Sequence, residues 1–234
     1  MKLSTIAKTS LALGILTTGV MTTYAQSADA AVQNVGVQIV SKEAQILHDY
    51  YSKTFWDLRN VNGEREGNVV KVIDKSQLTE VKLLGPEQNI IKDKESSQLD
   101  VFVVREGNGK QAPTLSINGI TKTNKNQYYD YNANPPVTLT KKNDNTIYQE
   151  SLGRFETNKE QITLKEIDFR LRQKLVKEKD LYKRSVSNGK IVVKMKEKGI
   201  KNDYYTFELN KKLQEDRMGV VINPKDIKEI SIDI

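Results

Sequence analysis

One strongly marked helix start, in a chain otherwise rich in short strands, most constrains the fold. Thr163 and Glu166 form a T-x-x-E capping box, whose side chains serve backbone amides left free by the first helical turn. Ile162 and Ile167 occupy the positions of a hydrophobic staple, which fixes the angle of chain entry. Apolar residues then recur at helical spacing: Leu164, Ile167, Leu171 and Leu175. We expect one long helix whose apolar face packs on a flat surface such as a sheet.

Short strand-like segments fill the first half of the chain. They are rich in Val, Ile, Leu and Phe, are separated by Gly, Asn, Asp or Pro, and cover residues 55–61, 68–73, 78–84, 99–104 and 114–121. Five such strands suit a small closed barrel, because closure removes exposed strand edges. Residues 41–51 have helical spacing, so a short helix is expected before the barrel.

A domain boundary is expected in residues 128–136, where Pro135 and Pro136 cannot donate backbone hydrogen bonds. Strand character resumes on both sides of the long helix, in residues 137–140, 146–155, 190–196, 204–209 and 227–234. The predicted class is therefore α+β, mostly β, with an N-terminal domain over 31–134 that includes the short helix and a C-terminal domain over 135–234.

The first thirty residues have the composition of a signal peptide. Lys2 and Lys8 precede an apolar run over 11–20, and Ala28-Asp29-Ala30 has the A-x-A form of a cleavage site. The apolar run is much shorter than the ~20 residues that cross a bilayer as a helix. Cleavage after Ala30 and secretion are expected; the alternatives are an N-terminal membrane anchor or a buried helix.

Composition excludes several kinds of site. The chain has no cysteine, which rules out a disulfide framework and a thiolate metal site, so each domain must be held together by its own core. The formal net charge of +7 favours anionic partners, such as glycans, acidic proteins or nucleic acid.

A longer motif covers the helix and its flanks. Its spacing is K-x2-I-x4-I-D-x3-R-x2-L-x5-L-Y, formed by Lys159, Ile162, Ile167, Asp168, Arg172, Leu175, Leu181 and Tyr182. This resembles the signature of staphylococcal and streptococcal superantigen toxins. Gly119-Ile120-Thr121 followed by Asn126 is similar to the end of that family's second signature, and residues 205–219 resemble its superantigen-like, or exotoxin-like, branch.

The resemblance implies a fold and a mode of action. It implies an N-terminal OB-fold barrel, a C-terminal β-grasp domain around the long helix, and a secreted virulence protein that serves immune evasion. Members of the branch bind a host immunoglobulin, complement component or leukocyte receptor, or sialylated glycans on leukocyte glycoproteins. True superantigens crosslink MHC class II to T-cell receptors, many through a disulfide loop and some through zinc; this chain has no cysteine and one histidine, which disfavours that activity.

The resemblance also suggests a glycan or anion site before the long helix, in residues 155–161. The candidates are Glu156, Thr157, Lys159 and Arg172. Lys159 and Arg172 could contact a sugar carboxylate, whereas Glu156 stands where glycan-binding members carry Thr and would repel sialate. The alternative is that Lys159 and Arg172 serve only the helix and domain packing, with Asp168 and Arg172 as an i, i+4 pair.

Two further clusters could contact a partner. Tyr128, Tyr129 and Tyr131 lie at the expected domain junction and could contact a partner protein or fill the groove between domains. The basic run over 170–184 could bind an anion or form a solvated helix face. Nucleic acid is disfavoured, because the run lacks interleaved aromatic residues.

An enzyme is not expected. His48, the sole histidine, falls on a predicted helix without a marked partner, and no G-x-S-x-G motif or glycine-rich phosphate loop occurs. Glu64 and Glu66 are interpreted as solvated loop residues. We expect no catalytic residue, cofactor or metal site, and no membrane insertion.

Overall fold

The computed structural model describes residues 41–107, 109, 112–143, 146–183, 188–196 and 204–234. The expected signal peptide, residues 1–30, and Arg184 of the basic run lie outside the described residues. Within the described part of the chain, no helix is long and apolar enough to cross a membrane.

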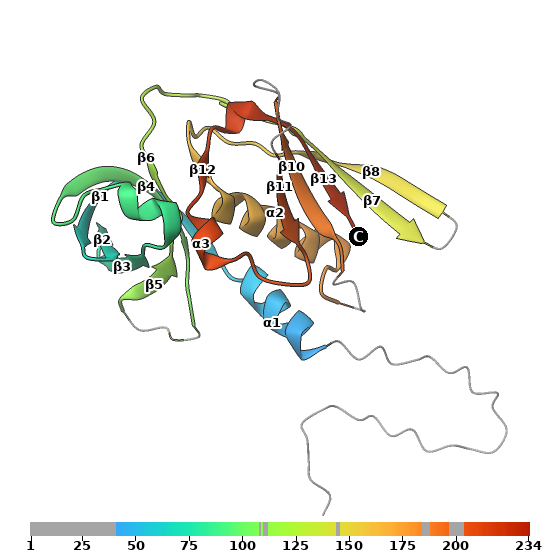
Figure 1. Ribbon diagram of the computed structural model, residues 1–234, viewed down its shortest axis with the longest axis horizontal. Helices are drawn as coiled ribbons and strands as arrows, with labels where there is room; N and C mark the ends of the chain where they lie inside the picture. The colour runs from blue at the N-terminus through green and yellow to red at the C-terminus, as the bar shows by residue number, and fades with distance from the viewer. Residues whose placement is uncertain (1–40, 108, 110–111, 144–145, 184–187, 197–203) are drawn as a thin grey trace, which may run out of the picture. The chain divides into compact units, whose positions relative to one another are not determined.

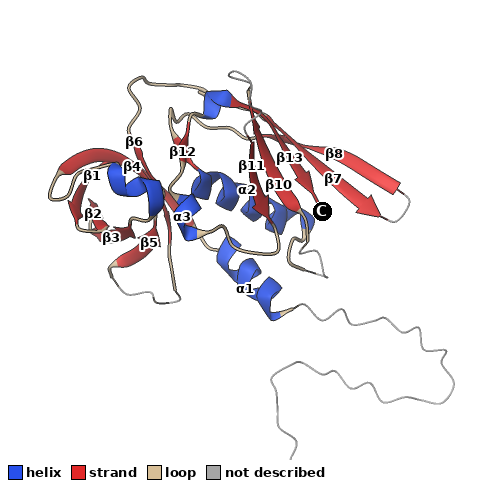
Figure 2. Ribbon diagram, viewed as in Figure 1, coloured by secondary structure: helices blue, strands red, loops and turns tan. Residues whose placement is uncertain are grey.

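The first half forms a curled, six-stranded sheet (Figures 1 and 2). Its strands are β1 (Phe55–Glu66), β2 (Val69–Asp74), β3 (Gln77–Lys82), β4 (Ser96–Val104), β5 (Thr114–Ile117) and β6 (Ile120–Lys122), with a short 3-10 helix η1 (Gly85–Asn89) between β3 and β4. The order is β5-β3-β2-β1-β4-β6, with β3 and β5 parallel and the other pairs antiparallel. The backbone N–H of Glu106 donates to Leu115 O at 2.8 Å, which brings β5 back to the end of β4.

The strand expected over 114–121 is two strands, because the backbone turns at Asn118 and Gly119. Both residues have positive φ, 48° and 102°. A Cβ at Gly119 would lie 2.4 Å from Phe102 O, so only glycine fits this close approach. β5 therefore pairs with β3, while β6 pairs with β4 on the other edge.

The second half packs α2 (Leu164–Lys179) against a five-stranded sheet. The sheet contains β7 (Pro136–Asn143), β8 (Thr146–Arg154), β10 (Lys190–Met195), β11 (Tyr204–Glu208) and β13 (Ile227–Asp233), in the order β11-β10-β13-β7-β8 with β13 parallel to β7. Smaller elements not predicted from the sequence are β9 (Ile162–Thr163), α3 (Glu215–Met218), β12 (Val221–Ile222) and η2 (Pro224–Asp226). The predicted fold class, an OB-fold barrel followed by a β-grasp domain with one long helix, is confirmed.

The long helix is buried more completely than its apolar face predicts. Leu164, Ile167, Leu171 and Leu175 are buried as expected, but so are the other faces, through Phe169, Val176, Lys165, Glu166, Asp168 and Arg172. The reason is that other elements also cover the helix: α1 (Lys42–Tyr51) brings Tyr51 into the same core, while Lys165 binds residues 116–118 and Glu166 binds Lys159. The short helix lies in a core that α2 and the five-stranded sheet share with Phe102 and Val104 of β4.

Glu64 and Glu66 are not loop residues. Both lie in β1, which extends beyond the predicted end at residue 61, pairing with β4 as far as Glu64 and with β2 as far as Glu66. Gly63 lies between them, where a Cβ would come within 3 Å of the Leu99 and Val70 side chains. The two carboxylates are surface positions on a strand.

Candidate functional site

The eight residues of the family signature are all buried. Arg172, with 0% of its surface exposed, donates from Nε to Asp168 Oδ1 at 2.7 Å and from Nη1 to Tyr182 Oη at 2.7 Å. Its guanidinium also donates to three backbone carbonyls at the end of β11 and beyond, and lies 4.7 Å from the centre of the Tyr51 ring. Burial raises the pKa of Tyr182 to about 12. Arg172 and its partners therefore hold α2 against α1 and against the end of β11.

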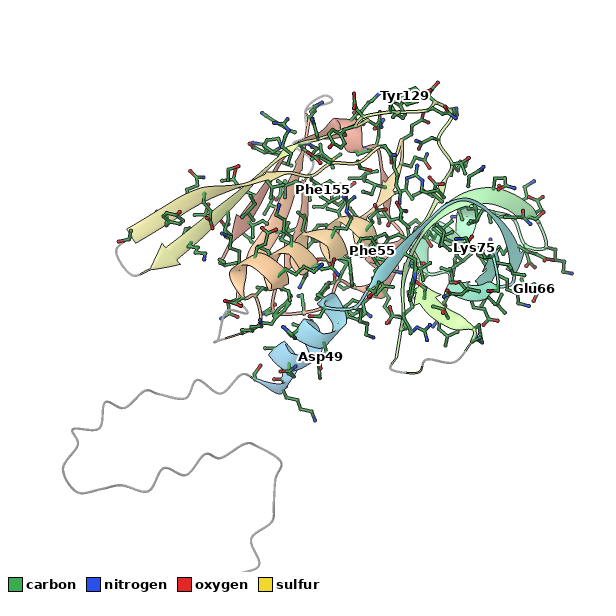
Figure 3. The ribbon with its side chains drawn as sticks, turned by 180° about the vertical axis from the view of Figure 1, so that it is seen from behind. Asp49, Phe55, Glu66, Lys75, Tyr129 and Phe155 are labelled. Atoms are coloured by element: carbon green, nitrogen blue, oxygen red, sulfur yellow. The ribbon has the colours of Figure 1, made fainter. Side chains whose placement is uncertain are left out.

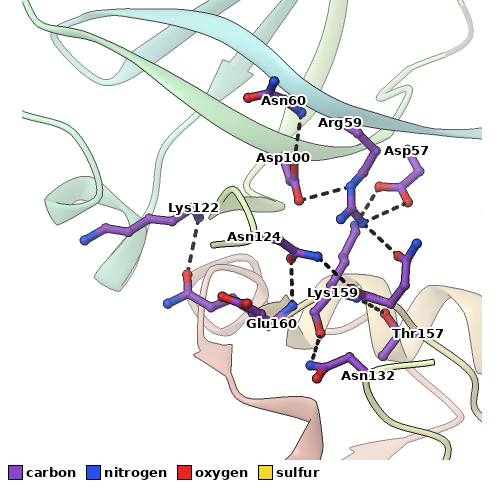
Figure 4. A network of polar contacts seen from close by, with 12 residues as sticks. Asp57, Arg59, Asn60, Asp100, Lys122, Asn124, Asn132, Thr157, Lys159 and Glu160 are labelled. Carbon is purple, nitrogen blue, oxygen red and sulfur yellow. Dashed lines mark hydrogen bonds and ion pairs between the residues drawn. The ribbon is translucent and has the colours of Figure 1, made fainter. Parts of the chain in front are cut away.

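Lys159 joins the two halves of the molecule (Figure 4). Its side chain is 2% exposed, and Nζ lies 2.6 Å from Asp57 Oδ1 of β1 and 2.6 Å from Glu166 Oε2 of α2. Lys159 and Arg172 were candidates for contact with a sugar carboxylate. Both charges are buried and paired within the protein, so the geometry supports the packing alternative.

Glu156 and Thr157 lie beside the linker, residues 123–135, which connects β6 of the first half to β7 of the second half. The backbone of Thr157 pairs with Ala133, with N to Ala133 O at 3.0 Å, and its side chain is buried. Glu156 is exposed, and its carboxylate accepts a hydrogen bond from Tyr131, which raises the pKa of the Tyr131 hydroxyl. This pairing brings the glycan candidates next to the tyrosine candidates.

A cavity of about 420 Å³, which we call the junction cavity, holds most of these residues. It is lined by Phe55, Asp57, Tyr129, Asp130, Tyr131, Glu156, Thr157, Asn158, Glu166 and Arg170. Four carboxylates and one guanidinium thus face the cavity. Arg170, which the sequence marked only as part of the basic run over 170–184, lies 4.5 Å from the centre of the Phe155 ring and donates to Glu156 O at 2.8 Å.

The three junction tyrosines divide into two roles. Tyr128 is half-buried, with its hydroxyl donating to Glu160 Oε1 at 3.2 Å and Lys225 Nζ 5.2 Å from its ring centre. Tyr129 is 96% exposed and Tyr131 is 53% exposed. Figure 3 shows Tyr129 at the edge of the molecule and Phe155, which is buried, nearer its middle. Tyr128 therefore packs between segments, while Tyr129 and Tyr131 are free to meet a partner.

Tyr129 also borders a second cavity, of about 550 Å³. Its polar wall is held by Arg59, whose Nε lies 3.1 Å from Asp100 Oδ2 and whose Nη1 donates to Asn158 Oδ1 at 3.3 Å (Figure 4). Asn124 Nδ2 donates to Asn158 O at 2.7 Å. The exposed Tyr129 ring therefore borders both the junction cavity and this second cavity, whose lining residues are held by hydrogen bonds and an ion pair.

The described part of the basic run over 170–184 does not form one solvated helix face, since of its basic residues only Lys177 and Lys183 are exposed and Lys183 follows the end of α2. Lys179 pairs with Glu150 at 2.7 Å and Lys183 with Asp180 at 3.3 Å, while Arg172 is buried. His48 lies on α1, 3.6 Å from Asp49. Among the residues that the structure describes, no group of three His, Cys, Asp or Glu side chains could hold a metal ion.

Two protein families match the chain over its two halves. Residues 45–124 match the staphylococcal superantigen-like OB-fold domain, and residues 135–234 match the staphylococcal/streptococcal toxin β-grasp domain.

Individual relatives cover the chain from end to end. Superantigen-like protein 11 of Staphylococcus aureus is 44% identical over 198 residues, which is 85% of this chain and 99% of that protein. Staphylococcal superantigen-like 5 of S. aureus strain Newman is 40% identical over the full length of both chains. A crystal structure of staphylococcal superantigen-like protein SSL5 with sialyl Lewis X has a TM-score of 0.74 and 36% identity, covering 82% of this chain and 99% of that one. The chain therefore belongs to the staphylococcal superantigen-like protein family.

Proposed function

We propose that this protein is a secreted immune-evasion protein that binds a host innate-immune protein or receptor and blocks or modulates it without catalysis. Its superantigen-like relatives support this class of function. The observation that carries the proposal is the exposed pair Tyr129 and Tyr131 beside the junction cavity. Exposed tyrosines next to a pocket are typical anchors of protein interfaces.

Hydrogen bonds fix the backbone on both sides of Tyr129 and Tyr131, which lowers the entropic cost of binding. On one side, Tyr128 is held by Glu160; on the other, the backbone N–H of Asn132 donates to Thr157 O at 2.9 Å. The acidic lining of the junction cavity favours a partner that brings a cationic or neutral side chain. By covering the partner's surface, the protein would block or modulate that partner through steric exclusion alone.

The second candidate is a lectin that binds sialylated glycans on leukocyte glycoproteins. The solved structure of SSL5 with sialyl Lewis X favours it. In the junction cavity, Arg170 is the cation available to a sialate carboxylate. Glu156 and Asp130 on the same wall would oppose an anionic sugar, which is why the protein partner is placed first.

Binding to human neutrophils, measured with and without sialidase treatment of the cells, separates the two candidates. The exported form, residues 31–234, is compared with Tyr129→Ala and with Tyr148→Ala, which removes an exposed ring from β8. We expect Tyr129→Ala to weaken binding at least ~10-fold, as for an interface anchor, and Tyr148→Ala to leave it unchanged. Sialidase should have no effect.

Other outcomes assign the function differently. Loss of binding after sialidase would establish the lectin, and equal effects of the two tyrosine variants would remove the junction cavity as the site. Pull-down from human serum and neutrophil lysate then identifies the partner. Proliferation of T cells that depends on MHC class II would point instead to superantigen activity.

A further inference from the structure

Two adjoining cavities on the other side of the linker form a strongly cationic surface. One, of about 420 Å³, is lined in part by Lys122, Lys125 and Lys225; the other, of about 330 Å³, by Arg154, Lys196 and Lys228. Asn132 and Lys225 line both cavities, so the two adjoin, and we call them together the lysine groove. It shares no lining residue with the junction cavity.

Glu160 is the one carboxylate among the described residues that line the lysine groove. Its carboxylate accepts hydrogen bonds from the backbone N–H groups of Lys125 and Asn126, each at 3.0 Å, from Asn126 Nδ2 and from Tyr128 Oη. These hydrogen bonds lower the pKa of Glu160. The Glu160 carboxylate is therefore hydrogen-bonded to the linker, and its single negative charge balances only a small part of the positive charge of the groove.

The groove lysines are not neutralised by described carboxylates. Where the structure describes both partners, Lys122, Lys125, Lys225 and Lys228 form no ion pair. Lys196 Nζ donates instead to the Lys225 carbonyl at 2.6 Å. Lysines without a described ion pair also occur outside the groove, for example Lys75 and Lys177. The groove differs from those positions because six basic side chains line its two cavities against one carboxylate.

The remaining lining indicates what kind of anion fits. Amide side chains of Asn126, Asn132, Asn223 and Gln161 supply both donors and acceptors, as hydroxyl and N-acetyl groups of a sugar chain require. Asn132 is 9% exposed; its Nδ2 donates to Lys159 O at 2.6 Å, while its Oδ1 accepts no hydrogen bond from a described residue. Asn132 Oδ1 is itself enclosed, so the ligand contacts in the groove come from the other three amide side chains.

Other polyanions fit this lining less well. None of the large apolar side chains exposed on the described surface lines the groove, so it lacks the anchors of a protein interface. The Tyr128 ring has Lys225 above it, so it is not free for base stacking, which single-stranded nucleic acid would use. We propose that the lysine groove binds a sulfated polysaccharide chain, with the lysines contacting sulfates and the amides contacting the sugar.

Heparin binding tests this proposal. The affinity of the exported form is measured by calorimetry across a series of salt concentrations and compared with that of the double variant Lys125→Gln/Lys225→Gln. The matched control, Lys92→Gln/Lys177→Gln, removes the same charge from exposed positions outside the groove. We expect the groove variant to bind at least ~10-fold more weakly with a shallower salt dependence, since fewer counterions are released, and the control to stay within about twofold of the parent.

Competition identifies the ligand class. Heparin is displaced by excess heparan sulfate but, on this proposal, not by hyaluronan, which lacks sulfate, by poly(dT) or by poly-glutamate at equal charge. Equal losses in the groove and control variants would overturn the site, because binding would then follow net charge alone. Effective competition by poly(dT) or poly-glutamate would overturn the ligand class. Unchanged thermal unfolding midpoints of both variants establish that any loss comes from the groove.

Discussion

Glu87 and Lys165 are buried titratable residues on either side of one backbone segment at the joint between the two halves. Glu87 Oε1 accepts hydrogen bonds from the N–H groups of Gly119 at 2.6 Å and Ile120 at 2.7 Å. Lys165 Nζ donates to three oxygens of residues 116–118 at 2.6 to 3.0 Å. Burial raises the pKa of Glu87 and lowers that of Lys165, each to about 8.

These shifts predict a pH dependence of stability. The native state holds the Glu87 proton up to a pKa of about 8, whereas the unfolded chain releases it near 4.5. The contribution of Glu87 to the free energy of unfolding is therefore fully present below pH 4.5. It is lost as the pH rises to 8, by at most about 1.4 kcal/mol per pH unit. Glu87→Gln, which keeps an acceptor for both N–H groups, should become more stable relative to the parent from pH 5 to pH 8, as measured by urea unfolding.

Glu95→Gln is the control, because Glu95 is an exposed acid of the same domain. It should show no such trend. Parallel stability curves for the parent and Glu87→Gln would contradict the assignment of the raised pKa to Glu87.

At the scale of the element, α2 combines a local start signal with partners from distant parts of the chain. Thr163 Oγ1 accepts a hydrogen bond from the Glu166 N–H at 3.3 Å, which is one half of the predicted capping box. The Glu166 carboxylate, predicted to form the other half, instead binds Lys159 Nζ at 2.6 Å and Arg170 Nη1 at 3.3 Å. The N–H of Leu164 donates to Val220 O at 2.9 Å. The helix start is thus completed by tertiary contacts.

Removing the cap hydroxyl should destabilise the protein measurably. We expect Thr163→Ala to lower the free energy of unfolding by about 1 kcal/mol, because the Glu166 N–H loses its acceptor inside the core. Thr163→Ser, which keeps the hydroxyl and loses the same methyl, should retain most of this stability in denaturant unfolding. If the Ser and Ala variants were equally destabilised, the methyl rather than the cap would be responsible.

At the scale of the whole molecule, one hydrophobic core crosses the joint between the described halves. It includes Phe102 and Val104 of β4 together with α1, α2 and the five-stranded sheet. The Phe102 ring lies 4.9 Å from that of Phe55 and 5.9 Å from that of Phe169 on α2. The barrel keeps a second, smaller core of its own. The shared aromatic contacts should make the two halves unfold as one unit.

Two spectroscopic probes test this cooperativity. Trp56, the only tryptophan, lies in β1 and reports on the barrel by fluorescence, while far-UV circular dichroism reports on the helices of the C-terminal core. We expect the two denaturant transitions to coincide. Phe169→Ala, which removes the ring shared by both halves, should shift both midpoints together and cost about 3–5 kcal/mol. A Trp56 transition that stays in place while the helix signal moves would show independent halves.

The sequence alone determined the class of the fold and most of its elements. The helix start at Thr163 and the strands around it follow from apolar periodicity and capping, which act within a few residues of each other. The parallel pairing of β13 with β7 and the turn at Asn118–Gly119 depend instead on segments far apart in the chain.

Only the tertiary structure decided which charged side chains are buried and which are available to a partner. Lys159 and Arg172 carry no mark of burial in the sequence, because enclosing a charge is tolerable only beside partners that folding supplies, here Asp57, Glu166 and Asp168. The junction cavity likewise exists because the linker pairs with the segment before α2, which sets Tyr129 and Tyr131 beside Glu156, and because the helix direction brings in Arg170. Local patterns specify elements, whereas the surface offered to a partner depends on how those elements meet.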